Sequence, residues 1–67
     1  MEEMYKDIET ELLEAAVESK KTVQVIFTNG YQTPAVIVDF DCNAFKLEVE
    51  GKTQLSYRHA VSTIVMD

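Results

Sequence analysis

The stretch LSYRHAVSTIV, from Leu55 to Val65, places an aromatic residue, a cation and the only histidine of the chain in consecutive positions. These residues, Tyr57, Arg58 and His59, follow a segment that alternates apolar and polar positions, and β-prone residues continue after them. Aromatic, cationic and titratable groups side by side are typical of an active site or of a nucleic-acid contact. The polar end of a strand has the same composition, so the rest of the chain must decide.

Length and cysteine content restrict the class of protein. With 67 residues, the chain is predicted to form one domain, 1–67, whose small core leaves little surplus over the conformational entropy lost on folding. Cys42 is the only cysteine, so neither an internal disulfide nor a zinc site with several cysteine ligands can form. We therefore expect no metal and no cofactor, and we expect additional burial from assembly into an oligomer.

Hydropathy and charge restrict the partners. The longest apolar run, Ala35 to Val38, is far too short to cross a bilayer, so we predict a cytoplasmic protein without membrane contact. The formal net charge of -6 argues against a general attraction to phosphate backbones. Any nucleic-acid binding must then come from a local arrangement of groups.

The N-terminal segment, from about residue 4 to residue 20, has the periodicity of a helix. At about 100° per residue, one apolar stripe contains Met1, Tyr5, Ile8, Leu12, Ala15 and Ala16. The opposite face carries a ridge of carboxylates, formed by Glu3, Asp7, Glu11, Glu14 and Glu18. This acidic ridge is either a solvated helix face or an anionic guard beside a binding surface, and both interpretations remain open.

From residue 22 to about residue 65 the period changes to two, which predicts short strands. Val23, Val25 and Phe27 share one face, and Asn29-Gly30 is a strong signal for a tight hairpin. Pro34 lacks the donor that a sheet ladder needs, so it should lie at an edge or a bulge.

Two further strands are predicted on either side of a Glu-Gly turn. In the first, Phe45, Leu47 and Val49 alternate with charged residues, so Phe45 is expected in the core. In the second, Leu55 and Tyr57 share a face, and STIV forms a last short strand. The fold class is thus mainly β with one N-terminal α-helix, in which a small bent antiparallel sheet curls into a barrel.

The order of these features and the run YRHAVSTIV resemble the bacterial Hfq family of Sm-like (LSm) RNA chaperones, whose second signature usually reads Tyr-Lys-His-Ala-Ile-Ser-Thr. The resemblance covers about residues 8–65 and includes Phe40-Asp41 and LEVEGKTQL. It implies the Sm-like fold, a helix over a five-stranded, strongly bent sheet that forms a small open barrel. It also implies a homo-oligomeric ring, most often a hexamer, that binds U-rich single-stranded RNA at its pore in post-transcriptional regulation.

The resemblance places Tyr57, Arg58 and His59 at the inner rim of the pore, with Arg58 in place of the family's lysine. For Tyr57, a role in joining neighbouring subunits competes with RNA contact. Two further positions of the pore face depart from the family. Beside Cys42, Asn43 stands where an aromatic residue stacks on uracil, and Glu9 stands where a glutamine reaches the same pocket.

On the opposite face, the family reads purine-rich RNA with an aromatic residue and a glutamine, which here are Ile26 and Pro34. Phe27, Gly30 and Tyr31 remain as pocket walls or as core and turn residues. Two functions therefore stand: an RNA-binding ring with weakened or altered affinity, or a ring used for protein interaction or for modulating another Hfq. We do not expect an enzyme, because the single histidine has no nucleophile near it in the sequence.

Overall fold

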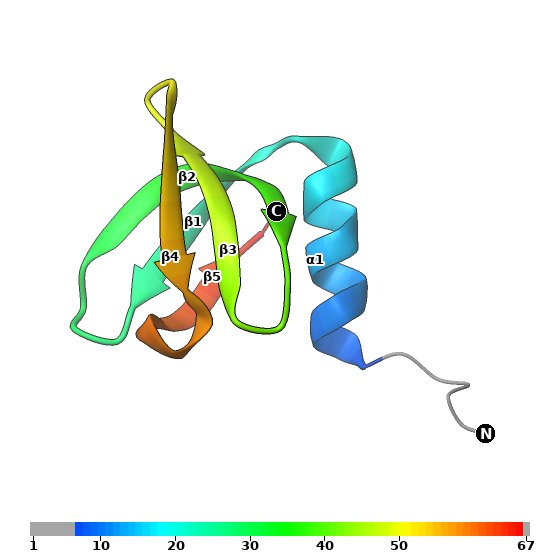
Figure 1. The fold of residues 1–67 in the computed structure, drawn as a ribbon, viewed down its shortest axis with the longest axis horizontal. Helices are drawn as coiled ribbons and strands as arrows, with labels where there is room; N and C mark the ends of the chain where they lie inside the picture. The colour runs from blue at the N-terminus through cyan, green and yellow to red at the C-terminus, as the bar shows by residue number, and fades with distance from the viewer. Residues whose placement is uncertain (1–6, 67) are drawn as a thin grey trace.

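The computed structural model describes residues 7–66, which form one α-helix followed by five strands (Figure 1). Their order is α1 (Ile8–Ser19), β1 (Thr22–Phe27), β2 (Gln32–Phe40), β3 (Ala44–Val49), β4 (Lys52–Tyr57), the 3-10 turn η2 (Arg58–Ala60) and β5 (Val61–Val65). The predicted fold class is confirmed. Residues 4–6 of the predicted helix, Met1 and Tyr5 of its stripe, and Glu3 of the acidic ridge lie outside the described residues.

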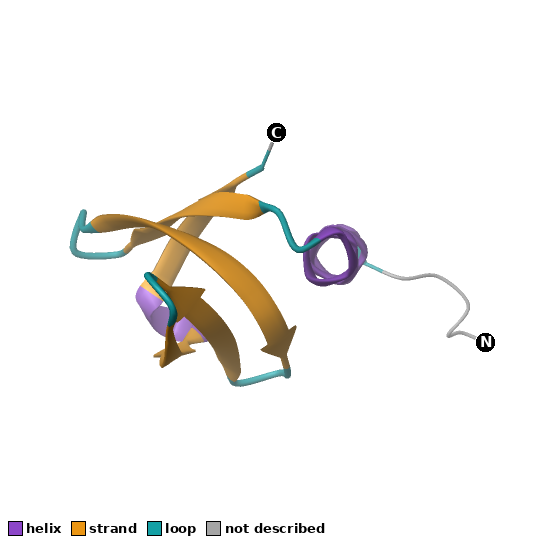
Figure 2. Ribbon diagram, turned by 90° about the horizontal axis from the view of Figure 1, so that it is seen from above, coloured by secondary structure: helices purple, strands orange, loops and turns teal. Residues whose placement is uncertain are grey.

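All five strands join one antiparallel sheet in the order β4-β3-β2-β1-β5. The sheet is strongly bent, and α1 stands beside it rather than inside the curve (Figure 2). β4 and β5, adjacent in the chain, thus become the two edge strands of an open barrel. Their edges have no strand partner within residues 7–66.

The core follows from the alternation along the strands. The inward positions of β1, β2 and β3 are nearly inaccessible, and α1 adds two more residues; together they are Leu13, Ala16, Val23, Val25, Ala35, Ile37, Phe45 and Leu47. Only 4% of the surface of Phe45 is exposed to solvent, which confirms its predicted core position. Burial of the valine, leucine, isoleucine and phenylalanine side chains among them contributes about 1.5 to 3 kcal/mol each.

Of the described residues of the predicted apolar stripe, only Ala16 lies on the face that the helix buries. Ile8 and Leu12 remain 76% and 50% exposed, whereas Leu13 and Ala16 are 3% and 5% exposed. Adjacent leucines give the sequence two possible faces. The helix packs against the sheet through Leu13, Ala16 and the half-buried Val17. Ala16 and Val17 follow Leu13 by three and four residues and so share its face of the helix, and this packing decides which face is buried.

Both predicted turns form. Gly30 has φ +92°, and the amide of Tyr31 donates to the Asn29 Oδ1 at 2.9 Å. Glu50 and Gly51 have φ values of 53° and 80°, the two positive angles that a tight two-residue hairpin requires.

Pro34 occupies a local edge, as predicted. It pairs with Gln24 of β1, but the pairing of β2 with β3 begins only at Val36. Residue 34 lies outside the β2–β3 ladder, so the N–H that proline lacks is not missed by that ladder. The bulge of β2 lies further along, between Ile37 and Asp39.

Candidate functional site

Arg58 and His59 lie on η2, the turn that joins the two edge strands, and Tyr57 is the last residue of β4. The amide of Arg58 donates to the Asn43 carbonyl at 2.9 Å, and the amide of Thr28 donates to the Ala60 carbonyl at 2.8 Å. These two bonds fasten the turn to the β2–β3 loop and to the β1–β2 loop. Residues far apart in the sequence therefore meet around Arg58.

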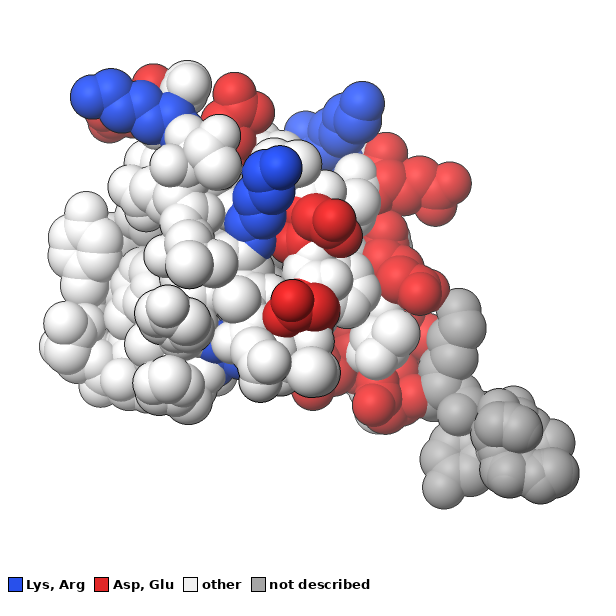
Figure 3. All heavy atoms as spheres, in the orientation of Figure 1, with Lys and Arg blue, Asp and Glu red and all other residues white. Residues whose placement is uncertain are grey.

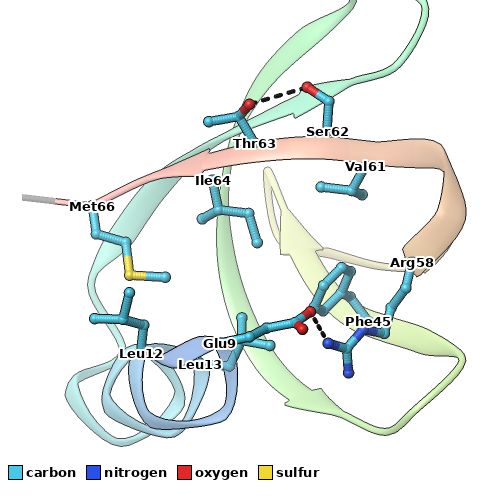
Figure 4. Close-up of a pocket in the computed structure, with 10 residues that line it drawn as sticks. All are labelled: Glu9, Leu12, Leu13, Phe45, Arg58, Val61, Ser62, Thr63, Ile64 and Met66. Atoms are coloured by element: carbon cyan, nitrogen blue, oxygen red, sulfur yellow. Dashed lines mark hydrogen bonds and ion pairs between the residues drawn. The ribbon is translucent and has the colours of Figure 1, made fainter. Parts of the chain in front are cut away.

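Arg58 is held by partners from three parts of the chain. Its Nη1 donates to the Asp41 carbonyl at 2.7 Å, and its Cζ lies 5.3 Å from the centroid of the Phe45 ring. Its Nη2 donates to Glu9 Oε2 in an ion pair (Figure 4). The side chain of Arg58 is 20% exposed and that of Glu9 is 59% exposed, so the ion pair lies at the mouth of a pocket with Glu9 on its solvent side.

The pocket beside this ion pair lies between α1 and β5 and has a volume of about 190 Å³. Figure 4 shows Leu12 and Met66 at one end and Arg58 with Phe45 at the other. Apart from the ion pair and two hydroxyl residues of β5, its walls are apolar.

The loop between β2 and β3 is shaped by Asp41. Its Oδ1 accepts from the amides of Asn43 and Ala44, both at 2.8 Å. These two hydrogen bonds to the charged form lower the pKa of the Asp41 carboxyl below its usual range. Cys42 and Asn43 are left exposed on the loop, next to the turn that carries Arg58.

Tyr57 and His59, on either side of Arg58 in the sequence, form an exposed pair of rings. The ring centroids are 5.8 Å apart and the ring planes differ by 20°, which is a stacked arrangement. Tyr57 is 53% exposed and His59 is also exposed. Flat aromatic surfaces of this kind are what nucleic-acid bases stack upon.

The first turn of α1 brings acidic groups to the site. Asp7 caps the helix by accepting from the amide of Thr10 at 2.8 Å, and hydrogen bonds from the Thr10 side chain and then its amide lower the pKa of the Asp7 carboxyl. Figure 3 shows acidic side chains gathered over α1. The described members of the acidic ridge, Asp7, Glu11, Glu14 and Glu18, are all exposed.

The residues predicted for the opposite face meet around the first hairpin. Phe27 and Tyr31 stack with centroids 5.9 Å apart and planes 29° from parallel. Tyr31 is 63% exposed, Ile26 is half-buried, and Gly30 forms the turn between them. The structure thus separates the predicted residues into a group around Arg58 and a group around the hairpin.

Two contacts were missed by the sequence reasoning. The resemblance to the Hfq family places Glu9 and Arg58, which carry opposite charges, on the pore face but does not predict that they pair. The Asp41 carbonyl, a backbone acceptor, leaves no signal in the sequence. Within residues 7–66, no cluster of His, Cys, Asp and Glu could hold a metal ion, and no helix is long and apolar enough to cross a membrane.

In sequence, this chain is similar to known proteins of one family. The family model described as Hfq protein matches residues 8–67. The RNA-binding protein Hfq of Natranaerobius thermophilus is 36% identical over 59 residues, which are 88% of this chain and 70% of that protein. The RNA-binding protein Hfq of Anoxybacillus flavithermus is 37% identical over 57 residues, 85% of this chain and 77% of that protein.

A solved structure has the same fold. The 1.55 Å crystal structure of the pleiotropic translational regulator Hfq superposes with a TM-score of 0.86 at 35% sequence identity. The match covers 90% of this chain and 100% of that one. With the family model matching nearly the whole described chain, and with relatives above 30% identity, this chain belongs to the Hfq family.

Proposed function

We propose that this chain is a cytoplasmic, ring-forming protein that binds U-rich single-stranded RNA in post-transcriptional regulation, by binding and not by catalysis. The observation that carries the proposal is the exposed Tyr57–His59 ring pair, whose two residues flank Arg58 in the sequence. Rings offer base stacking, and a guanidinium offers donors to a phosphate or a base edge. The relatives named RNA-binding protein Hfq support the same assignment.

The RNA affinity is proposed to be lower than is usual for such a site. Asn43 and Cys42 flank the site without an aromatic ring, and a stacked base contributes roughly 1 to 3 kcal/mol. Glu9 places a carboxylate against Arg58, and the chain as a whole carries a net charge of -6. Each of these features opposes the approach of a polyanion.

Ring assembly is proposed from the two edge strands. β4 and β5 present unused hydrogen-bonding edges within residues 7–66, and pairing β5 of one subunit with β4 of the next would use both. Such head-to-tail contacts close into a ring when the rotation between subunits divides a full turn. We propose six subunits, as the family resemblance implies.

A ring that binds a protein partner, or that modulates another Hfq, is the second candidate function. It is favoured by one observation, the exposed apolar residues of α1, Ile8 at 76% and Leu12 at 50%. Exposed apolar surface bounded by charged residues is a common feature of protein contacts.

The test of the proposed function is fluorescence anisotropy with short U-rich and A-rich RNA at low and moderate salt. We expect the wild-type protein to prefer the U-rich strand, and His59→Ala to weaken that binding about tenfold or more, as the loss of a stacking partner predicts. Arg58→Ala should also weaken U-rich binding.

The matched controls are Ile26→Ala and Tyr31→Ala, which change the hairpin group and should leave U-rich affinity unchanged. The reverse pattern would move the site to the hairpin. Absence of binding to either strand at low salt would favour the protein-partner function.

A further inference from the structure

The ion pair between Glu9 and Arg58 assigns a role to the acidic residue. We propose that Glu9 sets the RNA affinity of the site, because its carboxylate occupies the Arg58 donors that an RNA phosphate would use. Glu9 thereby acts as a competitor for RNA built into the same chain. The inference rests on the proposed function and adds a specific residue and mechanism to it.

The three contacts of Arg58 divide into a fixed part and a movable part. The Asp41 carbonyl, 2.7 Å from Nη1, belongs to a loop that Asp41 itself braces, and Phe45 under the guanidinium is a core residue. Glu9, in contrast, is 59% exposed and reaches Arg58 from the first turn of a helix. A ligand arriving from solvent therefore meets Glu9 first and can displace it without disturbing the other two contacts.

A carboxylate and a phosphate compete for the same hydrogen-bond donors of a guanidinium. Each presents a pair of anionic oxygens that accept the N–H groups of a guanidinium, so they cannot use the same edge of Arg58 together. In this chain the carboxylate is covalently present at every site and so has a high effective concentration. RNA must displace Glu9 to use the Nη2 group of Arg58.

The structure around Glu9 distinguishes competition from a purely architectural contact. α1 is anchored to the sheet by Leu13 and Ala16, which are 3% and 5% exposed, and its first turn is capped by Asp7. The helix therefore has its own anchor and cap without the ion pair. Removing the Glu9 charge should release the guanidinium while the helix stays in place.

The experiment compares Glu9→Gln with Glu18→Gln. Each variant removes one negative charge from α1 and keeps the size of the side chain. Glu18 lies nine residues further along the helix, roughly 14 Å away at 1.5 Å per residue. A general charge effect is thus common to both variants, and the release of Arg58 belongs to Glu9→Gln alone.

We expect Glu9→Gln to bind a U-rich RNA at least fivefold more tightly than Glu18→Gln in anisotropy titrations. Its affinity should also depend more steeply on salt, by about 0.7 in the log–log slope for each Arg58 that gains a phosphate. In an Arg58→Gln background the two variants should bind alike. Equal affinities of Glu9→Gln and Glu18→Gln on wild-type Arg58, with RNA still bound, would overturn this inference and leave the proposed function standing.

A measurement without RNA completes the test. Exchange of the Arg58 Nη2 hydrogens with solvent, followed by NMR, should accelerate in Glu9→Gln and stay unchanged in Glu18→Gln. Unchanged exchange in both would overturn the inference, since Glu9 would not restrain the guanidinium. Faster exchange in Glu9→Gln, together with no U-rich binding by any variant at low salt, would instead overturn the proposed function and the competition with it.

Discussion

Asn43 shows how one side chain can change the character of a site whose backbone is intact. The loop that carries it is fixed on both sides, by the Asp41 carboxylate and by the bond from the Arg58 amide to the Asn43 carbonyl. The side chain itself is exposed and adjacent to the signature turn. The position is therefore preorganised, but an amide offers no flat surface comparable to an aromatic ring.

Asn43→Phe should supply that missing surface. The backbone bonds of residue 43 do not depend on its side chain, so we expect the loop to keep its shape. A stacked base should then contribute roughly 1 to 3 kcal/mol, which is about fivefold to more than a hundredfold in affinity for U-rich RNA. Anisotropy titration of both proteins with U-rich and A-rich strands measures the change.

The matched control for this variant is Gln32→Phe, which adds an exposed ring on the hairpin side of the sheet. It should not change U-rich affinity. If Asn43→Phe gives no gain over Gln32→Phe while both proteins retain the wild-type assembly, the loop between β2 and β3 does not contact RNA.

At the scale of elements, local patterns predicted the strands but not the orientation of the helix. Alternation and Asn29-Gly30 define the first hairpin because both act over a few residues. The buried face of α1 depends on its contact with the sheet, and two adjacent leucines leave that choice open. The pairing of Glu9 with Arg58 spans 49 positions, so only the folded chain brings the two side chains together.

The two leucines of α1 allow a direct test of that orientation. Leu13→Ala should lower the free energy of unfolding by about 2 to 5 kcal/mol, because it leaves a cavity in the core. Leu12→Ala should change it by roughly 0.5 kcal/mol or less, as is usual at exposed positions. Urea unfolding followed by circular dichroism at one protein concentration gives both values, and equal losses in the two variants would contradict the observed helix face.

At the scale of the whole molecule, the chain combines a small core, two sheet edges that no strand within residues 7–66 covers, and a strong negative charge. β4 exposes Leu55 at 64% and β5 exposes Val65 at 48%, so both edges carry apolar side chains. Apolar edge strands favour pairing with another chain. The net charge of -6 on each chain opposes this pairing. Salt at 0.1 M screens the repulsion between exposed charges that lie more than about 10 Å apart.

Sedimentation velocity should therefore show a species near six times the 7.6 kDa chain mass, and raising the salt concentration should increase its fraction. Leu55→Lys should shift the protein toward smaller species, because a lysine on an edge strand opposes pairing with the next chain. Val38→Lys is the matched control, since Val38 is 41% exposed but lies on an internal strand, β2. Dissociation by both variants alike would point to general charge or stability effects, and a compact monomer of the wild-type protein at micromolar concentration would contradict pairing through β4 and β5.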